Sequence, residues 1–145
     1  PLHTFDAVVI SDYDKGFLTY EHIENLIQTF NGPVFVDTKK KDLARFEGAV
    51  IKINSIEYNL ATSLPKNNLI VTHGDKGVVW GNFHLPAELV ELVDVCGAGD
   101  TFLAALAFRY LVTKSLEDAI VFANKAASIT VQHRGNYAPD LEEIV

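Results

Sequence analysis

The sequence has 145 residues, 48% of them apolar, and a formal net charge of -7. This composition excludes a disordered chain and predicts one domain, or one part of a domain, with a hydrophobic core. The negative charge argues against nucleic acid as a main partner, because phosphate backbones are bound by clustered Lys and Arg. The single cysteine excludes a disulfide framework, and the five histidines show no spacing typical of a metal site.

The chain has no apolar run of membrane-spanning length and no signal-peptide pattern, so we expect no membrane partner and a cytoplasmic setting. It starts at Pro1 and contains no Met, which indicates a chain that was processed or excised from something longer. A missing half would leave a sheet edge and apolar surface exposed, through which copies could associate as a homo-oligomer.

The first third of the chain predicts a strand and a helix. Residues 7–10 are a short apolar run that ends in the polar turn 11–16. Thr19 is placed to cap a helix with Ile23 and Leu26 on its apolar face, and Asn-Gly-Pro at 31–33 ends it.

Further strands are predicted over residues 34–37, 49–53 and 69–72. Their continuous apolar runs suit a parallel sheet that is covered on both faces. Residues 78–80 and 82–85 predict a hairpin. Two helices follow, one from Asp100 and one that begins after a Ser115–Asp118 capping box and ends at Gly135, so the fold class is α/β with a mostly parallel sheet.

Polar residues follow each of the first four predicted strands. In open sheets of this kind, ligands bind at the carboxyl ends of the strands. Each residue alone also has a structural explanation, because polar residues commonly end strands. The residues that we expect on this edge are Asp12, Asp37, Lys39, Asn54, Glu57, Thr72 and Gly74.

The stretch 94–101, Asp-Val-Cys-Gly-Ala-Gly-Asp-Thr, predicts a glycine-bearing bend that opens a helix. The first N–H groups of a helix have no internal partner and lie at the positive end of its dipole, so they can hold a phosphate or an oxyanion. Asp100 beside such a seat suggests a group that takes a proton from an incoming hydroxyl. The alternative is an Asp that caps the helix, with Gly97 and Gly99 making a tight turn.

Asn54 and Glu57 are three residues apart and face the same way if a helix starts at Ser55. Their oxygens could hold a hydrated Mg²⁺ without enclosing it. An Asn cap with a solvent-facing Glu is an equally good interpretation.

Residues 94–101 resemble the C-terminal signature of the ribokinase (carbohydrate kinase) family, Asp-Thr-x-Gly-Ala-Gly-Asp, with Val95 in place of the Thr. The resemblance implies that the amides of Gly97, Ala98 and Gly99 form the anion hole, that Asp100 is the catalytic base, and that ATP is the phosphoryl donor.

Two more stretches resemble motifs of that family. Residues 52–57 are similar to its Lys-Pro-Asn-x-x-Glu, with Ile53 replacing the Pro, which implies that Asn54 and Glu57 act on Mg²⁺ and nucleotide phosphates. Residues 72–77 are similar to its Thr-x-Gly-x-x-Gly turn beside the nucleotide. The cofactor-binding residues implied in this way are Lys39, Lys52, Asn54, Glu57, Thr72, Gly74, Gly77, Asn124 and Ala127.

Within the family, residues 11–16 and 36–39 are similar to the heptose 7-phosphate kinases of ADP-heptose synthesis for lipopolysaccharide. The similarity spans nearly the whole chain and corresponds to the C-terminal half of such a kinase. It implies a ribokinase-like three-layer sandwich in which residues 1–145 are the nucleotide-binding and catalytic part, with the N-terminal sugar-binding half absent and the isolated fragment inactive.

The expected partners are therefore a nucleotide and a sugar phosphate. Two alternatives stay open at this point. One is a non-catalytic nucleotide-binding or interaction module, and the other is a different sugar or nucleoside kinase of the same family.

Overall fold

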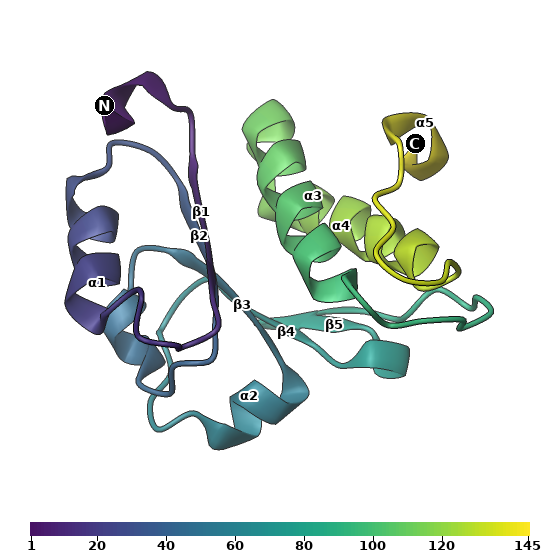
Figure 1. The fold of residues 1–145 in the computed structure, drawn as a ribbon, viewed down its shortest axis with the longest axis horizontal. Coiled ribbons are helices and arrows are strands. Elements are labelled where there is room, and N and C mark those ends of the chain that lie inside the picture. The colour runs from purple at the N-terminus through teal and green to yellow at the C-terminus, as the bar shows by residue number, and fades with distance from the viewer. The chain divides into compact units, whose positions relative to one another are not determined.

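The computed structural model describes residues 1–145, which divide into two compact units (Figure 1). The first unit contains residues 1–74 and 79–84, and the second contains residues 75–78 and 85–145. None of the helices is both long and apolar enough to cross a membrane.

The six strands form one sheet in which their order follows the sequence. The first four strands are parallel, with Ile10 paired to Val36 and Ile51 paired to Leu69. A two-residue turn with Gly81 at φ +54 joins the last two strands. These are β1 (Val8–Asp12), β2 (Val34–Thr38), β3 (Val50–Asn54), β4 (Leu69–Thr72), β5 (Val78–Trp80) and β6 (Phe83–Leu85). The predicted parallel sheet is confirmed, and no predicted strand boundary is wrong by more than two residues.

The first unit holds α1 (Tyr20–Thr29) and α2 (Ser55–Leu60), with the short 3-10 helices η1 (Leu2–Thr4) and η2 (Leu43–Phe46). A third, η3 (Gly74–Lys76), lies between β4 and β5. Thr19 caps α1 as predicted, because its side chain accepts the N–H of His22 at 3.2 Å. The core joins α1 and η2 to the sheet through Ile23, Phe46 and Ile51, all fully buried.

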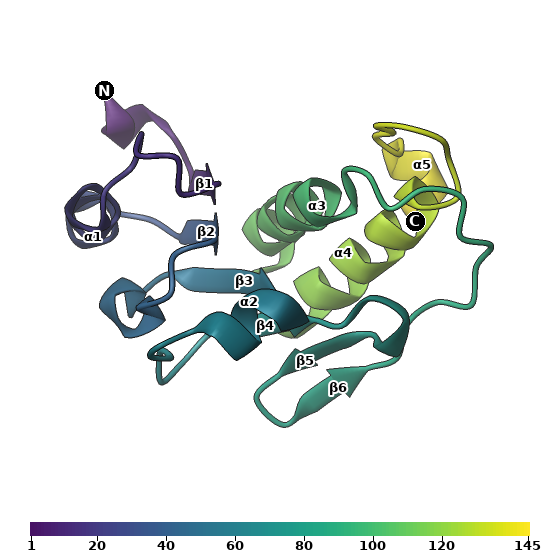
Figure 2. The ribbon, with the colours of Figure 1, turned by 60° about the horizontal axis from the view of Figure 1, so that its bottom comes forward.

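The second unit holds α3 (Ala98–Thr113), α4 (Leu116–Thr130) and the single-turn α5 (Leu141–Ile144). Figure 2 shows α3 and α4 side by side, and their residues Leu106 and Ile120 are fully buried. Arg109 Nε donates to Asp118 Oδ2 at 2.6 Å, which ties the end of α3 to the start of α4.

The prediction that the glycine-bearing bend opens directly into a helix is confirmed. This helix begins at Ala98, two residues before Asp100, because Gly97 turns the chain and is its N-cap. Two other predictions about these helices were wrong. Ser115 does cap α4, but Asp118 binds Arg109 and does not complete a capping box. The second error concerns the end of α4.

The second late helix ends at Thr130 and not at Gly135. The carbonyl of Val131 accepts the N–H groups of Val93 and Asp94, at 2.8 and 3.0 Å, and the N–H of Gly135 donates to the Asp94 side chain. The hydrogen bond that would have continued the helix from Val131 to Gly135 is therefore replaced by contacts with the segment before α3.

Candidate active site

The second unit contains the glycine bend, residues 94–99, which leads directly into α3. Gly97 has φ +77 and is the N-cap of α3, and no side chain caps this helix. A Cβ at Gly97 would also lie 3.1 Å from Asn136 Oδ1. A side chain at this position would therefore be strained by its backbone angle and by its neighbour, so the shape of the bend depends on glycine.

Two of the three predicted anion-hole amides are available to a ligand. The N–H groups of Gly97 and Gly99 have no acceptor within the chain, whereas the N–H of Ala98 contacts the carbonyl of Val95 at 3.3 Å. Unpaired N–H groups at the positive end of a 16-residue helix attract negative charge. The bend can therefore act as an anion-binding site. The roles of the individual amides stay predictions.

Asp94 holds the bend in place through two hydrogen bonds. Its Oδ1 accepts the N–H of Cys96 and its Oδ2 accepts the N–H of Gly135, both at 2.9 Å. These two backbone hydrogen bonds lower the pKa of Asp94 below its usual 3.8. Cys96 Sγ adds a contact of 3.1 Å to Asn136 Oδ1. The sequence had no signal for the part that Gly135 and Asn136 play, because they lie about 40 residues away in an irregular turn.

Asp100 is the third residue of α3 and is exposed to solvent. The alternative that it is the cap of the helix is wrong, because Gly97 occupies that position and no side-chain hydrogen bond caps α3. Its predicted role as a base is compatible with this placement in the first turn, within the same unit as the glycine bend.

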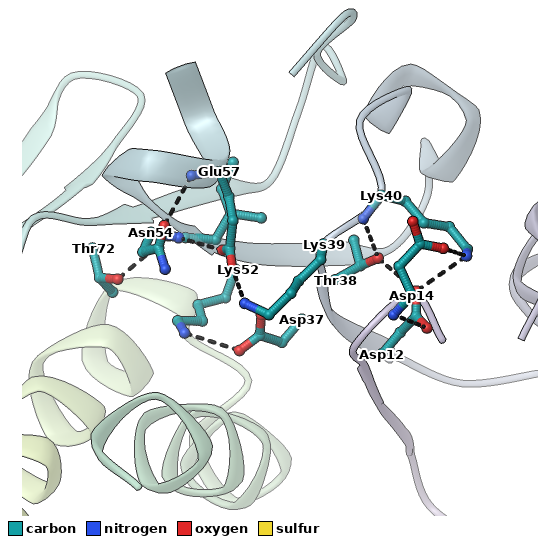
Figure 3. A network of polar contacts seen from close by, with 11 residues as sticks. Asp12, Asp14, Asp37, Thr38, Lys39, Lys40, Lys52, Asn54, Glu57 and Thr72 are labelled. Carbon is teal, nitrogen blue, oxygen red and sulfur yellow. Dashed lines mark hydrogen bonds and ion pairs between the residues drawn. The ribbon is translucent and has the colours of Figure 1, made fainter. Parts of the chain in front are cut away.

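The first unit contains a row of polar side chains at the carboxyl ends of β1 to β4 (Figure 3). Strand register places Asp12 beside Thr38, Asp37 beside Lys52, and Asn54 beside Thr72. The prediction that these residues share one edge of the sheet is confirmed.

Lys52 and Asp37 form an ion pair at this edge. Lys52 Nζ lies 2.9 Å from Asp37 Oδ2, and the lysine side chain is only 5% exposed. Burial raises the pKa of Asp37 above its usual 3.8, although the charge and hydrogen bond of Lys52 act in the opposite direction. A phosphate that reached Lys52 would have to compete with Asp37, so the predicted phosphate contact stays a prediction.

Asn54 and Glu57 form a complete capping box at the start of α2. The Asn54 side chain accepts the N–H of Glu57 at 2.9 Å, and Glu57 Oε2 accepts the N–H of Asn54 at 2.8 Å. The capping interpretation of Asn54 is thus confirmed, but Glu57 does not face solvent. Its side chain is largely buried, and Oε1 binds Lys39 Nζ at 2.8 Å. The hydrogen bond with Glu57 raises the pKa of Lys39 above its usual 10.5.

Asn54 and Glu57 fit a hydrated Mg²⁺ better than a Mg²⁺ ion that they coordinate directly. No group of three or more His, Cys, Asp or Glu is arranged to hold a metal. Both oxygens of Glu57 already accept one hydrogen bond each, and so does the Asn54 amide oxygen. Each oxygen keeps one lone pair that can accept a hydrogen bond from a metal-bound water.

A further ion cluster, which was not predicted from the sequence, joins β1 to β2. Lys40 is 4% exposed, and its Nζ lies 3.4 Å from Asp12 Oδ2 and is hydrogen bonded to Asp14. Thr38 Oγ1 donates to Asp12 Oδ2 at 2.8 Å and accepts the N–H of Lys40 at 3.0 Å. Lys40 lies in the basic run 39–41, which from sequence is typical of a solvated loop. Its burial depends on Asp14, 26 residues away, and on Asp12, which lies still earlier in the sequence.

The remaining predicted nucleotide residues divide between the two units. Thr72 and Gly74 belong to the first, where Thr72 Oγ1 contacts the carbonyl of Ile53 at 3.4 Å and Gly74 has open space around it. Gly77 belongs to the second, and a Cβ there would lie 2.0 Å from the carbonyl of Leu85. Asn124 on α4 contacts the carbonyl of Pro86 at 3.4 Å, and Ala127 is half-buried on the same helix.

Comparison with protein families identifies a match over residues 30–144 to the pfkB family of carbohydrate kinases. Among curated proteins, the chain is 37% identical over 163 aligned positions to the bifunctional protein HldE of a Nitratiruptor species. It is 33% identical to the bifunctional protein HldE of Vibrio atlanticus. These alignments cover 97% and 89% of the chain but only 35% and 32% of the relatives, so the chain spans about a third of their length.

Solved structures of ribokinases are similar in fold. The ribokinase of Thermotoga maritima has a TM-score of 0.79 and 26% identity, over 99% of this chain and 56% of that one. The Arabidopsis thaliana ribokinase, solved with ribose and ATP, has a TM-score of 0.76 and 21% identity, over 99% and 55% of the two chains. The fold is therefore ribokinase-like.

Proposed function

The chain belongs to the pfkB carbohydrate kinase family, and on this basis we propose that it takes part in ATP-dependent phosphoryl transfer to a sugar hydroxyl. The observation that carries the proposal is the glycine bend. Its unpaired N–H groups of Gly97 and Gly99 open α3, and Asp100 stands in the first turn of the same helix. Phosphoryl transfer needs a site for developing negative charge and an acceptor for a proton, and this segment offers both.

In the proposed mechanism the bend stabilises negative charge on the transferring γ-phosphoryl group. Donors that are already in place cost no reorganisation when charge develops, which is why fixed amides are effective in transition-state stabilisation. The bend is held in place because Asp94 accepts the N–H of Cys96 within it and the N–H of Gly135 from the turn after α4.

Asp100 is the proposed general base. A carboxylate that accepts the proton of the sugar hydroxyl makes its oxygen a better nucleophile toward phosphorus. The proton passes from the hydroxyl to a carboxylate oxygen of Asp100 as the new oxygen–phosphorus bond forms and the bond to the leaving ADP oxygen breaks.

In the first unit, Asn54 and Glu57 would hold the waters of a Mg²⁺ ion, which supplies positive charge to the nucleotide phosphates when it is bound. Lys39 is the proposed direct phosphate contact, because its side chain is half-exposed and carries its charge at the open edge of the sheet. Lys52 is buried against Asp37 and would stabilise this edge of the sheet. It would contact a phosphate only if its ion pair with Asp37 broke.

For the acceptor we propose a heptose 7-phosphate, and hence a role in ADP-heptose supply for lipopolysaccharide. Two things support this choice: the curated relatives that match the chain are HldE proteins, and residues 11–16 and 36–39 carry the motifs that resemble heptose 7-phosphate kinases. The proposal concerns the protein at its natural length. Residues outside the present sequence would supply further contacts with the sugar.

The test is turnover of an Asp100→Asn variant. On the protein at its natural length, the change should leave Mg-ATP affinity within about twofold and lower kcat by roughly 10² or more, the usual contribution of a general base. Glu117→Gln, which removes an acidic residue from the first turn of α4, is the matched control and should keep parental activity. Turnover of Asp100→Asn within a few-fold of the parent would remove Asp100 from this role.

The acceptor is tested separately, with heptose 7-phosphate, ribose and fructose 6-phosphate compared by kcat/KM. A preference for another sugar would retain the kinase and reject the heptose assignment. Binding of Mg-ATP without phosphorylation of any acceptor would instead identify a non-catalytic nucleotide-binding module.

A further inference from the structure

The first unit contains a cavity of about 700 Å³ that none of the proposed catalytic residues lines. It lies between the second half of α2, the loop 64–68, β4 and the β5–β6 hairpin, elements that can be followed in Figure 2. All of its lining residues belong to the first unit. Its volume is within the range of roughly 300 to 1,000 Å³ that is usual for small-molecule sites.

The cavity lies on the opposite face of β4 from the residue that we assign to the nucleotide. Side chains alternate between the two faces of a strand. Leu69, Val71 and His73 line the cavity, whereas Thr72 does not, and its Oγ1 donates to the carbonyl of Ile53 in the adjacent strand β3. An occupant of the cavity would therefore be separated from Thr72 by the sheet itself.

Three aromatic rings contribute to the wall. Trp80 and Phe83, from the two strands of the hairpin, pack edge to face with their centroids 6.4 Å apart, and Tyr58 of α2 contributes a third ring. Flat ring surfaces favour a planar aromatic guest, because stacking and edge contacts add to the burial of apolar area.

Several polar side chains in the wall form no hydrogen bond within the chain, whereas Asn67 binds Glu47. The side chains of Tyr58, His73, Trp80 and Asn82 make no hydrogen bond to any other residue. None of these polar atoms is buried without a partner, so each reaches solvent. A few unpaired donors and acceptors in an otherwise apolar cavity are what orient a small ligand.

The charge of the wall is unlike that of the rest of the chain. The chain carries a formal charge of -7, yet no Asp or Glu lines the cavity and Lys66 does. Lys66 Nζ forms no ion pair. Glu47, outside the wall, accepts the backbone N–H of Lys66 at 2.7 Å and the Asn67 side chain at 3.1 Å, which fixes the loop. The electrostatics therefore favour an anion over a cation.

We propose that this cavity is a second ligand site, which binds a planar aromatic molecule that carries an anionic group. The rings of Tyr58, Trp80 and Phe83 hold the aromatic part, and Lys66 pairs with the anion. The site does not depend on the proposed kinase function, because it shares no residue with the glycine bend or with the Asn54–Glu57 pair.

Trp80 is the only tryptophan of the chain, so all tryptophan fluorescence comes from the wall of this cavity. Two probes form a matched pair: 8-anilinonaphthalene-1-sulfonate, and N-phenyl-1-naphthylamine, which lacks the sulfonate. We expect saturable energy transfer from Trp80 to both probes, with the sulfonate bound about three- to tenfold more tightly, as expected for one partly screened charge pair. Lys66→Ala should remove this preference and retain binding of the neutral probe.

Two controls separate this site from others. Phe83→Ala should weaken the binding of both probes, and Asp100→Asn should weaken neither. Absence of saturable transfer from Trp80, an unchanged preference in Lys66→Ala, or unchanged binding of both probes in Phe83→Ala would each overturn the proposal. Probe binding that weakens as the protein concentration rises would also overturn it, because a second copy of the chain would then occupy the cavity.

Discussion

At the scale of single residues, Lys40 is a buried charged side chain that is paired with two carboxylates. Its ammonium group is buried between Asp12 and Asp14, and the Asp12 side chain is 4% exposed as well. Removing one partner of a buried ion pair leaves an uncompensated charge, which costs far more than an exposed pair contributes. Lys40 therefore has a structural role that its position in a short basic run does not indicate.

We predict that Lys40→Met lowers the free energy of unfolding by about 3 to 5 kcal/mol, because Asp12 loses its counter-ion while it stays buried. Lys41→Met, the exposed neighbour, is the control and should change stability by less than about 0.5 kcal/mol. Urea unfolding measures both. The double variant Lys40→Met/Asp12→Asn should recover part of the loss, and a loss below about 1 kcal/mol in the single variant would contradict this role.

The same lysine predicts a pH dependence. Burial disfavours its charged form, but the hydrogen bond to Asp14 and the charge of Asp12 outweigh burial, so the pKa of Lys40 is raised above its usual 10.5. A raised pKa on a base stabilises the folded state fully below the unfolded value, and this stability is lost as the pH rises through the folded value. The difference in free energy of unfolding between the wild type and Lys40→Met should thus be constant from about pH 7 to 10 and become smaller above pH 10.

At the scale of elements, α2 is a short helix with a complete capping box at its start. It has six residues, far fewer than the roughly 12 that an isolated helix needs for marginal stability. Asn54→Ala should lower the free energy of unfolding by about 1 kcal/mol, whereas Asn54→Ser, which can still cap, should cost only a few tenths. Equal losses in the two variants would show that the cap is not the source of stability.

The same two variants separate the cap from the proposed metal role. Both remove the amide oxygen, so both should raise the Mg²⁺ concentration at half-maximal activity if Asn54 holds a metal-bound water. If Asn54 acts only as a cap, Asn54→Ser should keep the parental Mg²⁺ dependence.

Helix starts could be predicted from the sequence, but helix ends less so. Thr19 and Ser115 cap through local hydrogen bonds to a residue three positions on, and a local pattern is sufficient to find them. The end of α4 depends on the carbonyl of Val131, which accepts the N–H groups of Val93 and Asp94. The Asp118 side chain binds Arg109 and does not complete the capping box. Contacts at this distance leave no mark on the local sequence.

At the scale of the whole molecule, the order of strands and the polar edge of the sheet could be predicted, because apolar runs and the residues that follow them are local features. Which charges pair along that edge could not. Lys52 with Asp37, and Lys39 with Glu57, are partners 15 and 18 residues apart that meet only when β2 and β3 are adjacent. The cavity beside Trp80 was missed for the same reason, since its wall comes from separate segments.

Nucleotide binding should be visible as a change in the stability of the whole chain. A ligand that binds only the folded state stabilises it by about 2.7 kcal/mol at 100 times its Kd. For a chain of this size that corresponds to a rise in Tm of roughly 5 to 10 °C. Differential scanning calorimetry with Mg-ATP should show such a rise, and Mg²⁺ alone should not.

Variants assign this rise to particular residues. Asp100→Asn should keep it, because the proposed base acts on the sugar hydroxyl and not on the resting nucleotide. Gly97→Ala should reduce it, since a Cβ would strain a residue at φ +77 and crowd Asn136, and so distort the amides that hold the phosphate. A Tm that does not respond to millimolar Mg-ATP would mean that the 145-residue chain does not bind the nucleotide by itself. A rise that Gly97→Ala leaves intact would separate nucleotide binding from the glycine bend.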